Sequence, residues 1–380
     1  MNTVVVFEDS SKADFGGGQQ VSREMIDVLL DLKYKVCVID FALKSRFQNS
    51  ISHLKLPTEI LSARNVPLKK NLYNSFSFSY LEILFNIFLI PPNLFRIYRF
   101  LKNDGINDLI IICTTKRAML YMSIFKILNR RQKIVFYFHN VFKPKSKWRK
   151  IFRKISQLSD ANWFVSKTAL ASLGPKNGEI IYNPIINLEE KSKVTLSPPK
   201  RKFTIGSASS LYLYKGIQNA ISAFQDERLN DVEFHIYGQG PMLNYLLDLS
   251  KGRENIKFMG FQSNRGMIFE SIDVLIVPSI DEESFSLVAF EAISWNVPII
   301  LSNNGAHLEF FDGNSALFVN PNNQEEIINS ILKYKDNKDD LRSIHVKNAI
   351  NRRKEFSLAK YSERIKDSLI SIYEKNTSNI

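Results

Sequence analysis

Residues 272–301 read IDVLIVPSIDEESFSLVAFEAISWNVPIIL. The apolar runs 273–277 and 297–301 are each typical of a buried parallel strand. Between them lie a loop with three acidic residues and a helical stretch, which we expect to begin near Phe285 with Ser284 as its N-cap. A strand, a loop, a helix and a second strand in this order predict an α/β unit with a parallel sheet.

The same alternation of apolar runs and helical stretches extends along the 380 residues of the chain. In the first half we expect strands near residues 3–7, 35–40, 109–113, 133–138, 161–165 and 179–182. In the second half we expect them near residues 202–206, 232–237, 256–259, 273–277 and 297–301. We therefore predict two Rossmann-like α/β domains that face each other across a cleft, an N-terminal domain 1–188 and a C-terminal domain 202–355. A polar linker, 189–201, separates them.

The charge of the chain is unevenly distributed. Residues 1–185 contain 28 Lys and Arg against 13 Asp and Glu, whereas the remainder contains 23 against 25, so the net charge of +13 comes from the first half. This asymmetry predicts an anionic partner, either membrane lipid or nucleic acid. Cys37 and Cys113 lie far apart in apolar runs, which favours a reducing compartment over a disulfide framework. The N-terminus lacks a basic segment before a long apolar core, so we expect no signal peptide and a cytoplasmic protein.

A basic and aromatic stretch, FKPKSKWRKIFRK, occupies residues 142–154. Cations with Trp148, Ile151 and Phe152 among them are typical of a helix that binds an anionic lipid surface. The alternative is a solvated helix whose apolar residues face the core. We favour the first, with a membrane or acceptor surface formed by Lys143, Lys145, Lys147, Trp148, Arg149 and Lys150. Residues 72–101 are also aromatic, but their uninterrupted apolar part is about half of the roughly 20 residues that a membrane span needs.

The segment 272–301 contains groups suited to a nucleotide-sugar. The amides of Ser286 and Leu287, aligned with the helix dipole, would bind a diphosphate. Glu283, just before the helix, would accept hydrogen bonds from sugar hydroxyls, and Glu291 on the helix would bind ribose hydroxyls. Two glutamates at this spacing also occur by chance. However, an unpaired carboxylate in an otherwise apolar helix is costly, which favours a functional role.

Glu283-x7-Glu291, followed by Ala292 and by VPII at 297–300, resembles the donor-site signature of GT-B glycosyltransferases of the retaining family four (glycosyl transferases group 1). Further segments resemble landmarks of this family in the family's order: FGGGQQVSREMIDVLLDLKYKVCVI at 15–39, FHN at 138–140, ANWFVSKTAL at 161–170, IYNPI at 181–185, KGIQNAISAF at 215–224, FHIYGQGP at 234–241 and IKFMGF at 256–261. The resemblance covers nearly the whole chain. It implies a nucleotide-sugar-dependent transferase whose C-terminal helix, 356–380, packs back on the N-terminal domain.

The resemblance also implies roles for individual residues of the second half. Lys215 would neutralise the donor diphosphate, and the helix start at Phe285, Ser286 and Leu287 would bind the donor. Gly238 and Gly240 would let the backbone approach the nucleotide closely. Gly260 and Phe261 would border the base, and Glu309 would approach the donor pocket.

In the first half, the resemblance implies that Gly16, Gly17 and Gly18 form a loop close to the donor phosphate or sugar. Three glycines alone are a weak signal, because a flexible turn needs them equally. His139, at the carboxyl end of a predicted strand, would lie beside the transferred sugar or the acceptor hydroxyl. With Glu283 and Lys215, it completes the expected catalytic set.

One departure from the family concerns the donor phosphates. Family members commonly carry an arginine shortly before the lysine of the Lys-Gly pair, and here Ser209 and Ser210 stand in that region. Arg265 is a candidate to replace the missing cation. We find no Asp-x-Asp motif and no His/Cys cluster with metal-ligand spacing, so we expect a metal-independent enzyme without a cofactor. The co-substrate is expected to be a UDP-sugar in preference to a GDP-sugar.

We therefore predict a retaining transferase that moves a hexose or N-acetylhexosamine to a lipid-linked or lipopolysaccharide acceptor in bacterial surface polysaccharide synthesis. Such an enzyme would be peripheral at the inner face of the cell membrane. A nucleotide-sugar epimerase of the same architecture is the alternative. A nucleic-acid-binding protein is disfavoured, because it would leave the two glutamates unexplained, and a non-enzymatic membrane module is a weaker third interpretation.

Overall fold

The computed structural model describes residues 2–10, 17–42, 45–61, 88–103, 109–185, 202–336 and 338–374. They form two compact units. The first contains the described residues up to Pro184 and from Leu358 onward, and the second contains those from Ile185 to Ser357. The predicted linker 189–201, Gly16 and residues 72–87 of the apolar stretch lie outside the described residues.

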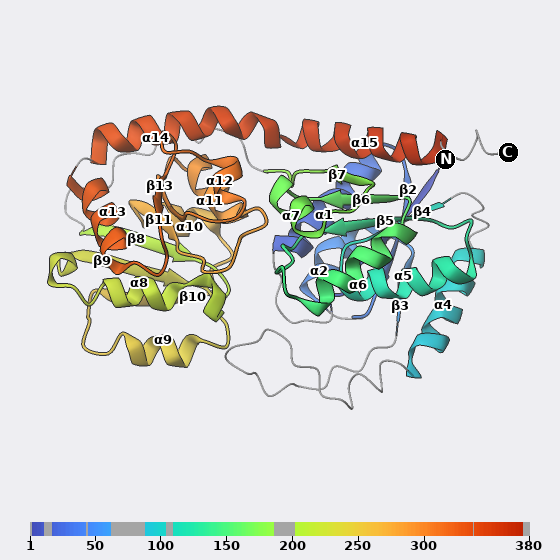
Figure 1. The fold of residues 1–380 in the computed structure, drawn as a ribbon, viewed down its shortest axis with the longest axis horizontal. Coiled ribbons are helices and arrows are strands. Elements are labelled where there is room, and N and C mark those ends of the chain that lie inside the picture. Colours follow the sequence, from blue (N-terminus) through green and yellow to red (C-terminus); the bar gives the residue numbers. More distant parts are fainter. Residues whose placement is uncertain are drawn as a thin grey trace. The chain divides into compact units, whose positions relative to one another are not determined.

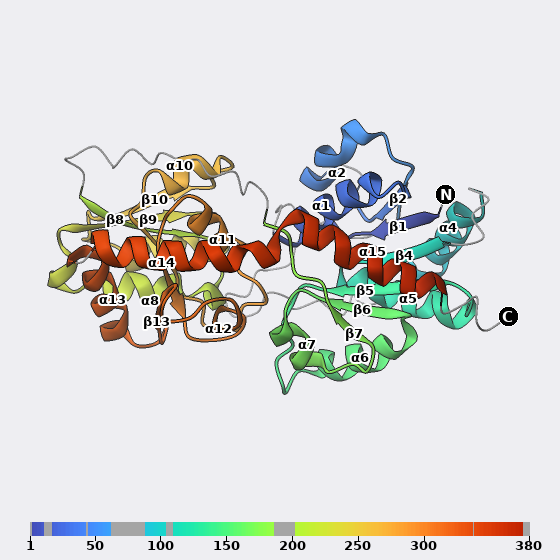
Figure 2. The ribbon, with the colours of Figure 1, turned by 90° about the horizontal axis from the view of Figure 1, so that it is seen from above.

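The first unit is a parallel sheet with helices on both faces (Figures 1 and 2). Its strands are β1 (Thr3–Phe7), β2 (Lys35–Asp40), β3 (Thr58–Ile60), β4 (Leu109–Cys113), β5 (Lys133–Phe138), β6 (Ala161–Phe164) and β7 (Gly178–Ile180), in the spatial order β3-β2-β1-β4-β5-β6-β7. Its helices are α1 (Gly17–Asp31), α2 (Arg46–Ile51), α4 (Ile90–Asn103), α5 (Lys116–Leu128), α6 (Lys147–Ile155), α7 (Lys167–Leu173) and α15 (Leu358–Glu374), with 3-10 turns η1 (Ser52–Leu54) and η2 (Ser156–Leu158).

The second unit repeats this plan with a smaller sheet (Figure 1). Its parallel strands are β8 (Phe203–Ala208), β9 (Val232–Tyr237), β10 (Ile256–Gly260), β11 (Val274–Val277), β12 (Ile299–Ser302) and β13 (Leu317–Val319), in the order β10-β9-β8-β11-β12-β13. Its helices are α8 (Ile217–Ala223), α9 (Leu243–Leu249), α10 (Arg265–Phe269), α11 (Leu287–Ser294), α12 (His307–Phe310), α13 (Gln324–Asp336) and α14 (Lys338–Arg353), with 3-10 turns η3 (Leu213–Lys215), η4 (Glu227–Leu229) and η5 (Lys354–Phe356).

The central strands have the composition that a sheet covered on both faces requires. β1 reads TVVVF and β4 reads LIIIC, and every residue of both strands is buried. β1 pairs in parallel with β2 on one side and with β4 on the other, so that Val5 is opposite both Cys37 and Ile111. Near-continuous β-branched runs are expected where helices cover both faces. The predicted α/β class with two parallel sheets is confirmed.

The helices begin and end where local side chains satisfy the backbone. Thr115 caps α5 by accepting a hydrogen bond from Ala118 N–H, and Ser166 caps α7 in the same way through Ala169 N–H. α7 ends at Gly174, whose φ of +66° is the left-handed conformation that glycine adopts at little cost. The two side-chain caps thus fix where the loops after β4 and β6 turn into helices.

The C-terminal helix α15 belongs to the first unit, as predicted. Trp163 Nε1 on β6 donates a hydrogen bond of 2.8 Å to Ser368 Oγ on α15. The Tyr373 hydroxyl reaches the carbonyl of Thr3 at 3.5 Å, and the Lys133 ammonium lies 4.3 Å from the centre of the Tyr373 ring. Helix α15 therefore packs on the sheet of the first unit. The chain continues from Pro184 into the second unit and returns to the first at Leu358.

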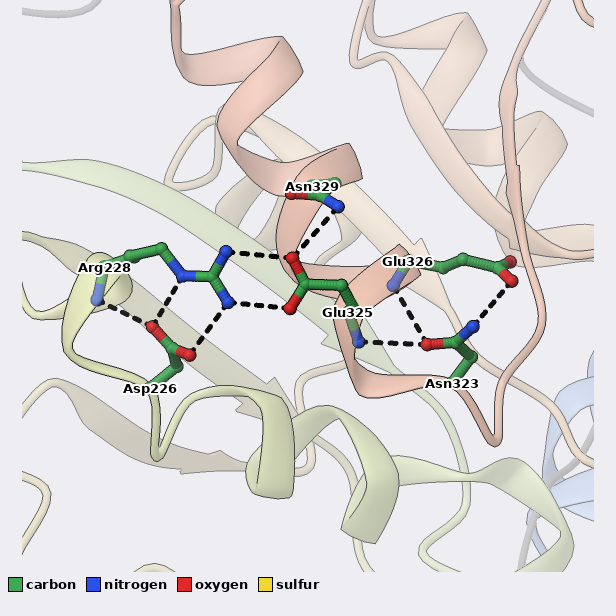
Figure 3. Close-up of polar contacts among 6 residues, drawn as sticks. All are labelled: Asp226, Arg228, Asn323, Glu325, Glu326 and Asn329. Atoms are coloured by element: carbon green, nitrogen blue, oxygen red, sulfur yellow. Dashed lines mark hydrogen bonds and ion pairs between the residues drawn. The ribbon is translucent and has the colours of Figure 1, made fainter.

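The start of α13 is held by a polar network on the surface of the second unit (Figure 3). Asn323 Oδ1 accepts hydrogen bonds from the N–H groups of Glu325 (3.1 Å) and Glu326 (3.3 Å), as an N-cap does. The Arg228 guanidinium, already bound to Asp226, makes a bidentate contact with Glu325 at 2.7 and 2.9 Å. This network joins α13 to the turn η4. Because it is exposed, we assign it a positioning role and little stabilisation.

Two strands were not expected from the sequence. β3 and β13 each have three residues and each lies at an edge of its sheet. Runs this short, TEI and LFV, do not stand out from loop sequence.

Candidate functional site

The second sheet changes its winding direction between β8 and β11. From β8 the chain adds β9 and β10 on one side, and then returns to add β11, β12 and β13 on the other. In open α/β sheets, ligands bind at the carboxyl ends of the strands at such a point. The turn η3, which ends at Lys215, follows β8, and Ser279 and Glu283 follow β11.

Lys215 and Glu283 meet at this point. Lys215 Nζ lies 2.6 Å from Glu283 Oε1, and the Ser279 hydroxyl donates to the same oxygen at 2.5 Å. Burial alone would raise the pKa of Glu283, but the ammonium of Lys215 and the two hydrogen bonds hold it at about 2. Burial would lower the pKa of Lys215, but the carboxylate beside it raises that pKa above its ordinary value. Both groups are therefore charged at neutral pH.

Two glycines allow the loops around this ion pair to touch. Gly216 has a φ of +71°, and a Cβ there would lie 1.8 Å from the carbonyl oxygen of Pro278. Gly305 has a φ of +56°, and a Cβ there would lie 2.8 Å from the backbone N and O of Glu283. Ala306 N–H also donates to the Glu283 carbonyl at 2.9 Å. The loops after β8, β11 and β12 thus pack backbone against backbone.

Helix α11 begins later than the sequence suggested. Its first residue is Leu287 and its N-cap is Ser286, whose φ of +70° and ψ of +62° are left-handed. The expected start at Phe285 and the expected cap Ser284 are therefore wrong. A residue with a left-handed backbone cannot be part of a right-handed helix, so the helix begins only after Ser286. Glu291 consequently lies about one turn into the helix. The Ala289 amide donates to the Ser286 carbonyl at 3.1 Å. The amides of Leu287 and Val288 come before this hydrogen bond and are the ones available to an anion.

Phe285 is a core residue. Its side chain is 2% exposed and packs against Phe290, Phe310 and Phe356, with ring centres 4.8 to 5.6 Å apart. Phe285, expected at the helix start to bind the donor, therefore packs in the core of the second unit.

Glu291 is paired, contrary to the assumption made from the sequence. Arg265 Nε lies 3.4 Å from Glu291 Oε2. Burial raises the pKa of Glu291, and the guanidinium of Arg265 acts against this rise. Arg265, considered above as a replacement phosphate ligand, therefore has an acidic partner on α11. The 3.4 Å contact with Arg265 is an ion pair and not a hydrogen bond. Glu291 Oε2 receives no hydrogen bond from any described residue, so it can still accept one.

Gly238 and Gly240 are explained by packing within the protein. A Cβ on Gly238, whose φ is +134°, would lie 1.9 Å from the carbonyl oxygen of Ser209, and one on Gly240 would lie 2.5 Å from that of Leu211. Gly260 has a φ of +71° but no heavy atom within 4 Å of its virtual Cβ. The Phe261 side chain beside it is 48% exposed. Gly260 and Phe261, at the end of β10, therefore have free space around them on the surface of the second unit.

Three polar residues near Glu283 were not predicted. Ser279 binds Glu283 directly, and Asn304 Nδ2 donates to the Ser279 carbonyl at 3.0 Å. His307 is completely buried, with Nδ1 3.0 Å from the Ser302 carbonyl, and its Nε2 has no hydrogen-bond partner among the described residues. Ser279 follows β11 at the winding reversal, so its position could have revealed it. His307 sits on α12, in a stretch that carries no such signal, and Glu309 is half-buried on the same helix.

In the first unit, His139 follows β5 and is half-buried. Its ring centre lies 4.2 Å from that of Tyr137, and burial lowers its pKa to about 4, so the imidazole is neutral at pH 7. Gly17 and Gly18 form the exposed first turn of α1, where a loop was expected. A Cβ on Gly18 would meet nothing within 4 Å, so packing inside the unit does not require glycine there.

The basic stretch forms a turn followed by α6 on the surface of the first unit. Lys143, Lys145, Lys147 and Lys150 are exposed, Trp148 is 46% exposed and Ile151 is 41% exposed. Phe152, expected as an anchor beside Trp148, is fully buried against Phe138 and Phe142. Arg149 is partly buried, and its Nε donates to the carbonyl of Ser172 at 2.6 Å. One face of α6 therefore packs on the core and the other is exposed and basic, and binding to lipid stays a prediction.

Residues 189–352 match the family model described as "Glycosyl transferases group 1". The second unit is a group 1 glycosyltransferase domain. An uncharacterised glycosyltransferase of Methanocaldococcus jannaschii is 29% identical over 170 residues, and the O-antigen biosynthesis glycosyltransferase WclY of Escherichia coli is 25% identical over 155 residues. These matches cover 39% and 40% of this chain, and 42% of each relative. The matched stretch thus spans about two fifths of the length of these relatives.

Solved structures extend the likeness to the whole chain. HepE of Anabaena, in complex with UDP and glucose, superposes with a TM-score of 0.76 at 18% identity, covering 97% of this chain and 99% of that one. The lipopolysaccharide outer core galactosyltransferase WaaB superposes with a TM-score of 0.71 at 14% identity, covering 98% and 99%. The fold of the chain is therefore GT-B. Within the described residues, no three His, Cys, Asp or Glu side chains are grouped to hold a metal ion, and metal independence stays a prediction.

Proposed function

We propose that this group 1 glycosyltransferase transfers a hexose or N-acetylhexosamine, with retention of configuration and without a metal ion, from a UDP-sugar to a lipid-linked or lipopolysaccharide saccharide. The observation that carries the proposal is the Lys215–Glu283 ion pair at the winding reversal of the second sheet, next to the start of α11. In this proposal Lys215 and the α11 amides bind the diphosphate. Glu283 binds hydroxyls of the transferred sugar, and Glu291 binds those of the ribose.

The ion pair suits a ligand that carries anionic and hydroxyl groups side by side. Lys215 has three donors and Glu283 has two acceptor oxygens, and the mutual contact occupies one of each. A sugar diphosphate can add a phosphate oxygen to the ammonium and a hydroxyl to the carboxylate without separating the pair. The side chains are 21% and 15% exposed, so part of each is within reach of a ligand.

In a retaining transfer, the bond between the anomeric carbon and the diphosphate oxygen breaks, and a bond from the acceptor oxygen forms on the same face of the sugar. The acceptor hydroxyl proton passes to the departing diphosphate. The protein's part is positioning and charge stabilisation, in which Lys215 and the α11 amides oppose the charge that develops on the leaving group. His139, neutral at pH 7, can accept a hydrogen bond from a sugar or acceptor hydroxyl.

The names of similar proteins support the donor and acceptor classes. HepE structures are described in complex with UDP and with UDP-glucose. WclY is described as acting in O-antigen biosynthesis, and WaaB as a lipopolysaccharide galactosyltransferase. A UDP-sugar and a surface-polysaccharide acceptor are therefore the first substrates to test.

The decisive experiment measures thermal shift and hydrolysis with a panel of UDP-, GDP- and dTDP-sugars. A ligand at a hundredfold excess over its Kd stabilises the folded state by roughly 2.7 kcal/mol, which is readily measured. For the wild type we expect a shift with UDP and a larger one with a UDP-sugar. Lys215→Met should lose both, whereas Glu283→Gln should keep the UDP shift and lose the sugar increment. Lys251→Ala removes an exposed lysine of the same unit and serves as the control.

Four results would contradict the proposal. If no nucleotide-sugar stabilises the wild type, the proposed donor site is wrong. Rapid epimerisation of a UDP-sugar without acceptor would favour the epimerase interpretation. Activity lost in EDTA and restored by magnesium would refute metal independence, and an inverted anomeric signal in the NMR spectrum of the product would refute retention.

We propose that the first unit attaches to an anionic membrane surface at the cytoplasmic face. The outward side of α6 presents exposed lysines with Trp148 and Ile151, and α4 exposes Phe95 and Tyr98. Lys102 lies 5.9 Å from the centre of the Tyr98 ring, so α4 also combines an aromatic ring with a cation. Basic and aromatic side chains on one helix suit the headgroup region of anionic lipid. None of the helices in the described ranges is long and apolar enough to cross a bilayer.

Vesicle sedimentation tests this attachment. With phosphatidylglycerol in the vesicles we expect binding, and with phosphatidylcholine alone we expect little. Each lysine near the surface contributes about 1 kcal/mol, so replacing Lys147, Lys150 and Lys154 by Glu should weaken binding by about a hundredfold or more. The matched control replaces the exposed Lys33, Lys35 and Lys366 by Glu, with the same change in net charge. Equal loss in both variants would show that binding depends on overall charge and not on α6.

A further inference from the structure

The first sheet also reverses its winding direction, between β1 and β4. Glu8 follows β1 directly, and Thr114 follows β4 directly. Their side chains meet across the reversal, with Thr114 Oγ1 2.7 Å from Glu8 Oε2. A carboxyl group thus lies at the point of the first unit that corresponds to the Lys215–Glu283 pair in the second.

Glu8 is almost entirely buried, with 2% of its surface exposed. Among the described residues, three groups contact its carboxyl: the Ser22 hydroxyl on α1 lies 2.6 Å from Oε2, the Thr114 hydroxyl contacts the same oxygen, and Asp9 N–H donates to Oε1 at 3.0 Å. The carboxyl therefore connects β1, β4 and α1. A buried carboxyl normally requires a cationic partner or full hydrogen bonding, and here the partners are hydroxyls and an amide.

Both hydroxyls have a second acceptor in reach. Ser22 Oγ lies 3.1 Å from the carbonyl of Gly18, and Thr114 Oγ1 lies 3.1 Å from the carbonyl of Phe7. When Glu8 is ionised, both hydroxyls can donate to its carboxylate. When Glu8 carries a proton, the hydroxyls can turn to the two carbonyls, and the carboxyl can donate to one of the hydroxyl oxygens. The cluster is therefore hydrogen-bonded in both protonation states.

The surroundings favour proton exchange near neutral pH. Burial raises the pKa of Glu8 to about 7, against the hydrogen bonds that lower it, and Asp40 at the end of β2 adds to the rise. Asp40 itself accepts hydrogen bonds from the amides of Ser10 and Phe41. From α5, Arg117 lies 3.3 Å from Asp9, which follows Glu8 in the chain. On α1, the neighbours of Ser22 are Arg23 and Glu24, which pair with each other at 3.5 Å.

We propose that Glu8 is a proton-dependent positioning residue, whose ionisation changes the hydrogen bonds of Ser22 and Thr114 and thereby sets how the glycine-containing start of α1 is held for substrate binding. The proposal rests on the proposed transferase activity. Gly18, whose carbonyl is the alternative acceptor for Ser22, is in the exposed first turn of α1. Glu8 does not touch substrate in this proposal, because it is buried beneath that turn.

The test compares wild type with Glu8→Gln. The amide of glutamine can donate to both Ser22 and Thr114, whose hydroxyls then donate to the two carbonyls, so this variant should fold as the protonated form does. In the wild type we expect KM for the saccharide acceptor to change by about tenfold between roughly pH 5.5 and pH 8.5, with little change in kcat. Glu8→Gln should show no such step. Glu179→Gln on β7 is the matched control and should keep it.

A second variant guards against misfolding of the first. Ser22→Ala removes a hydrogen bond that lowers the pKa of Glu8, so the midpoint of the KM profile should move to higher pH. A wild-type profile without a step near neutral pH would overturn the proposal. So would a step that persists in Glu8→Gln, or a midpoint unmoved by Ser22→Ala. Absence of transfer by the wild type would instead refute the proposed function, whereas titration of Glu8 can still be followed by urea unfolding against pH.

Discussion

Lys215 Nζ and Glu283 Oε1 lie 2.6 Å apart although 68 residues separate them in the chain. The loops that carry them leave adjacent strands, β8 and β11, at the winding reversal of the second sheet. Gly216 and Gly305 permit the backbone contacts that bring the loops together. The ion pair is thus a product of topology, and it places a cation and an anion at the edge where a ligand would bind.

The pair predicts an acid-sensitive contribution to stability. The pKa of Glu283 falls from 4.5 to about 2 in the folded protein. A depressed carboxyl pKa stabilises the folded state above pH 4.5, and this stabilisation is lost as pH falls through about 2. The contribution is about 3 kcal/mol, since each pKa unit corresponds to about 1.4 kcal/mol. Urea unfolding of Glu283→Gln, from neutral pH down to about pH 2.5, should lack this component.

Glu254→Gln is the control for that series, because Glu254 is exposed in the same unit. It should follow the wild type at every pH. At neutral pH we also expect Glu283→Gln to be less stable than the wild type by about 3 kcal/mol, because Lys215 is left charged and mostly buried without its partner. A wild-type acid profile unchanged by the substitution would show that the pair does not lower the pKa of Glu283.

Glu8 predicts a pH dependence of opposite sign. Its pKa rises from 4.5 to about 7 on folding. The folded state is therefore favoured below pH 4.5, and this advantage is lost as pH rises through about 7. Over that range Glu8→Gln should gain about 3 kcal/mol relative to the wild type, as measured by urea unfolding at closely spaced pH values. A constant difference between the two proteins would mean that Glu8 does not titrate in this range.

Two glycines with the same φ provide a matched test of close packing. Gly216 and Gly260 both have a φ of +71°, but a Cβ on Gly216 would lie 1.8 Å from Pro278 O, whereas one on Gly260 meets nothing within 4 Å. Gly260→Ala should therefore cost about 1–2 kcal/mol, the penalty of the left-handed backbone alone. Gly216→Ala should cost several kcal/mol more or prevent folding, because two loops must separate. Similar unfolding midpoints for both variants would contradict this account.

Much of the fold was predictable because buried parallel strands have a strong sequence signal. β1 and β9 were predicted at their observed bounds, and the C-terminal helix at its observed partner unit. The short edge strand β3 was missed because three residues are too few to form a pattern. The start of α11 was misplaced because Ser284 is a good N-cap in sequence, and nothing in the sequence reveals that Ser286 adopts a left-handed backbone.

The candidate site was predictable where function depends on position after a strand, and less so where it depends on contacts. Lys215 and Glu283 were both singled out, but their direct contact requires the sheet order. The pairing of Glu291 with Arg265, and the burial of Phe285, are tertiary facts of the same kind. Glu8 was not singled out, because a glutamate after a strand reads as an ordinary loop acid until its burial is known.

At Ser286 we expect folding stability and donor binding to favour different residues. Its φ of +70° is costly for a residue with a Cβ, and its hydroxyl is buried without a hydrogen-bond partner among the described residues. Ser286→Gly should therefore stabilise the protein by about 1 kcal/mol, because glycine adopts this backbone freely. Ser286→Ala keeps the Cβ and should gain less. If the hydroxyl binds the donor, both variants should lose affinity for a UDP-sugar in calorimetry while Ser294→Ala, on the same helix, should not. If both variants bind the UDP-sugar as tightly as the wild type, the strained backbone at Ser286 has no role in binding.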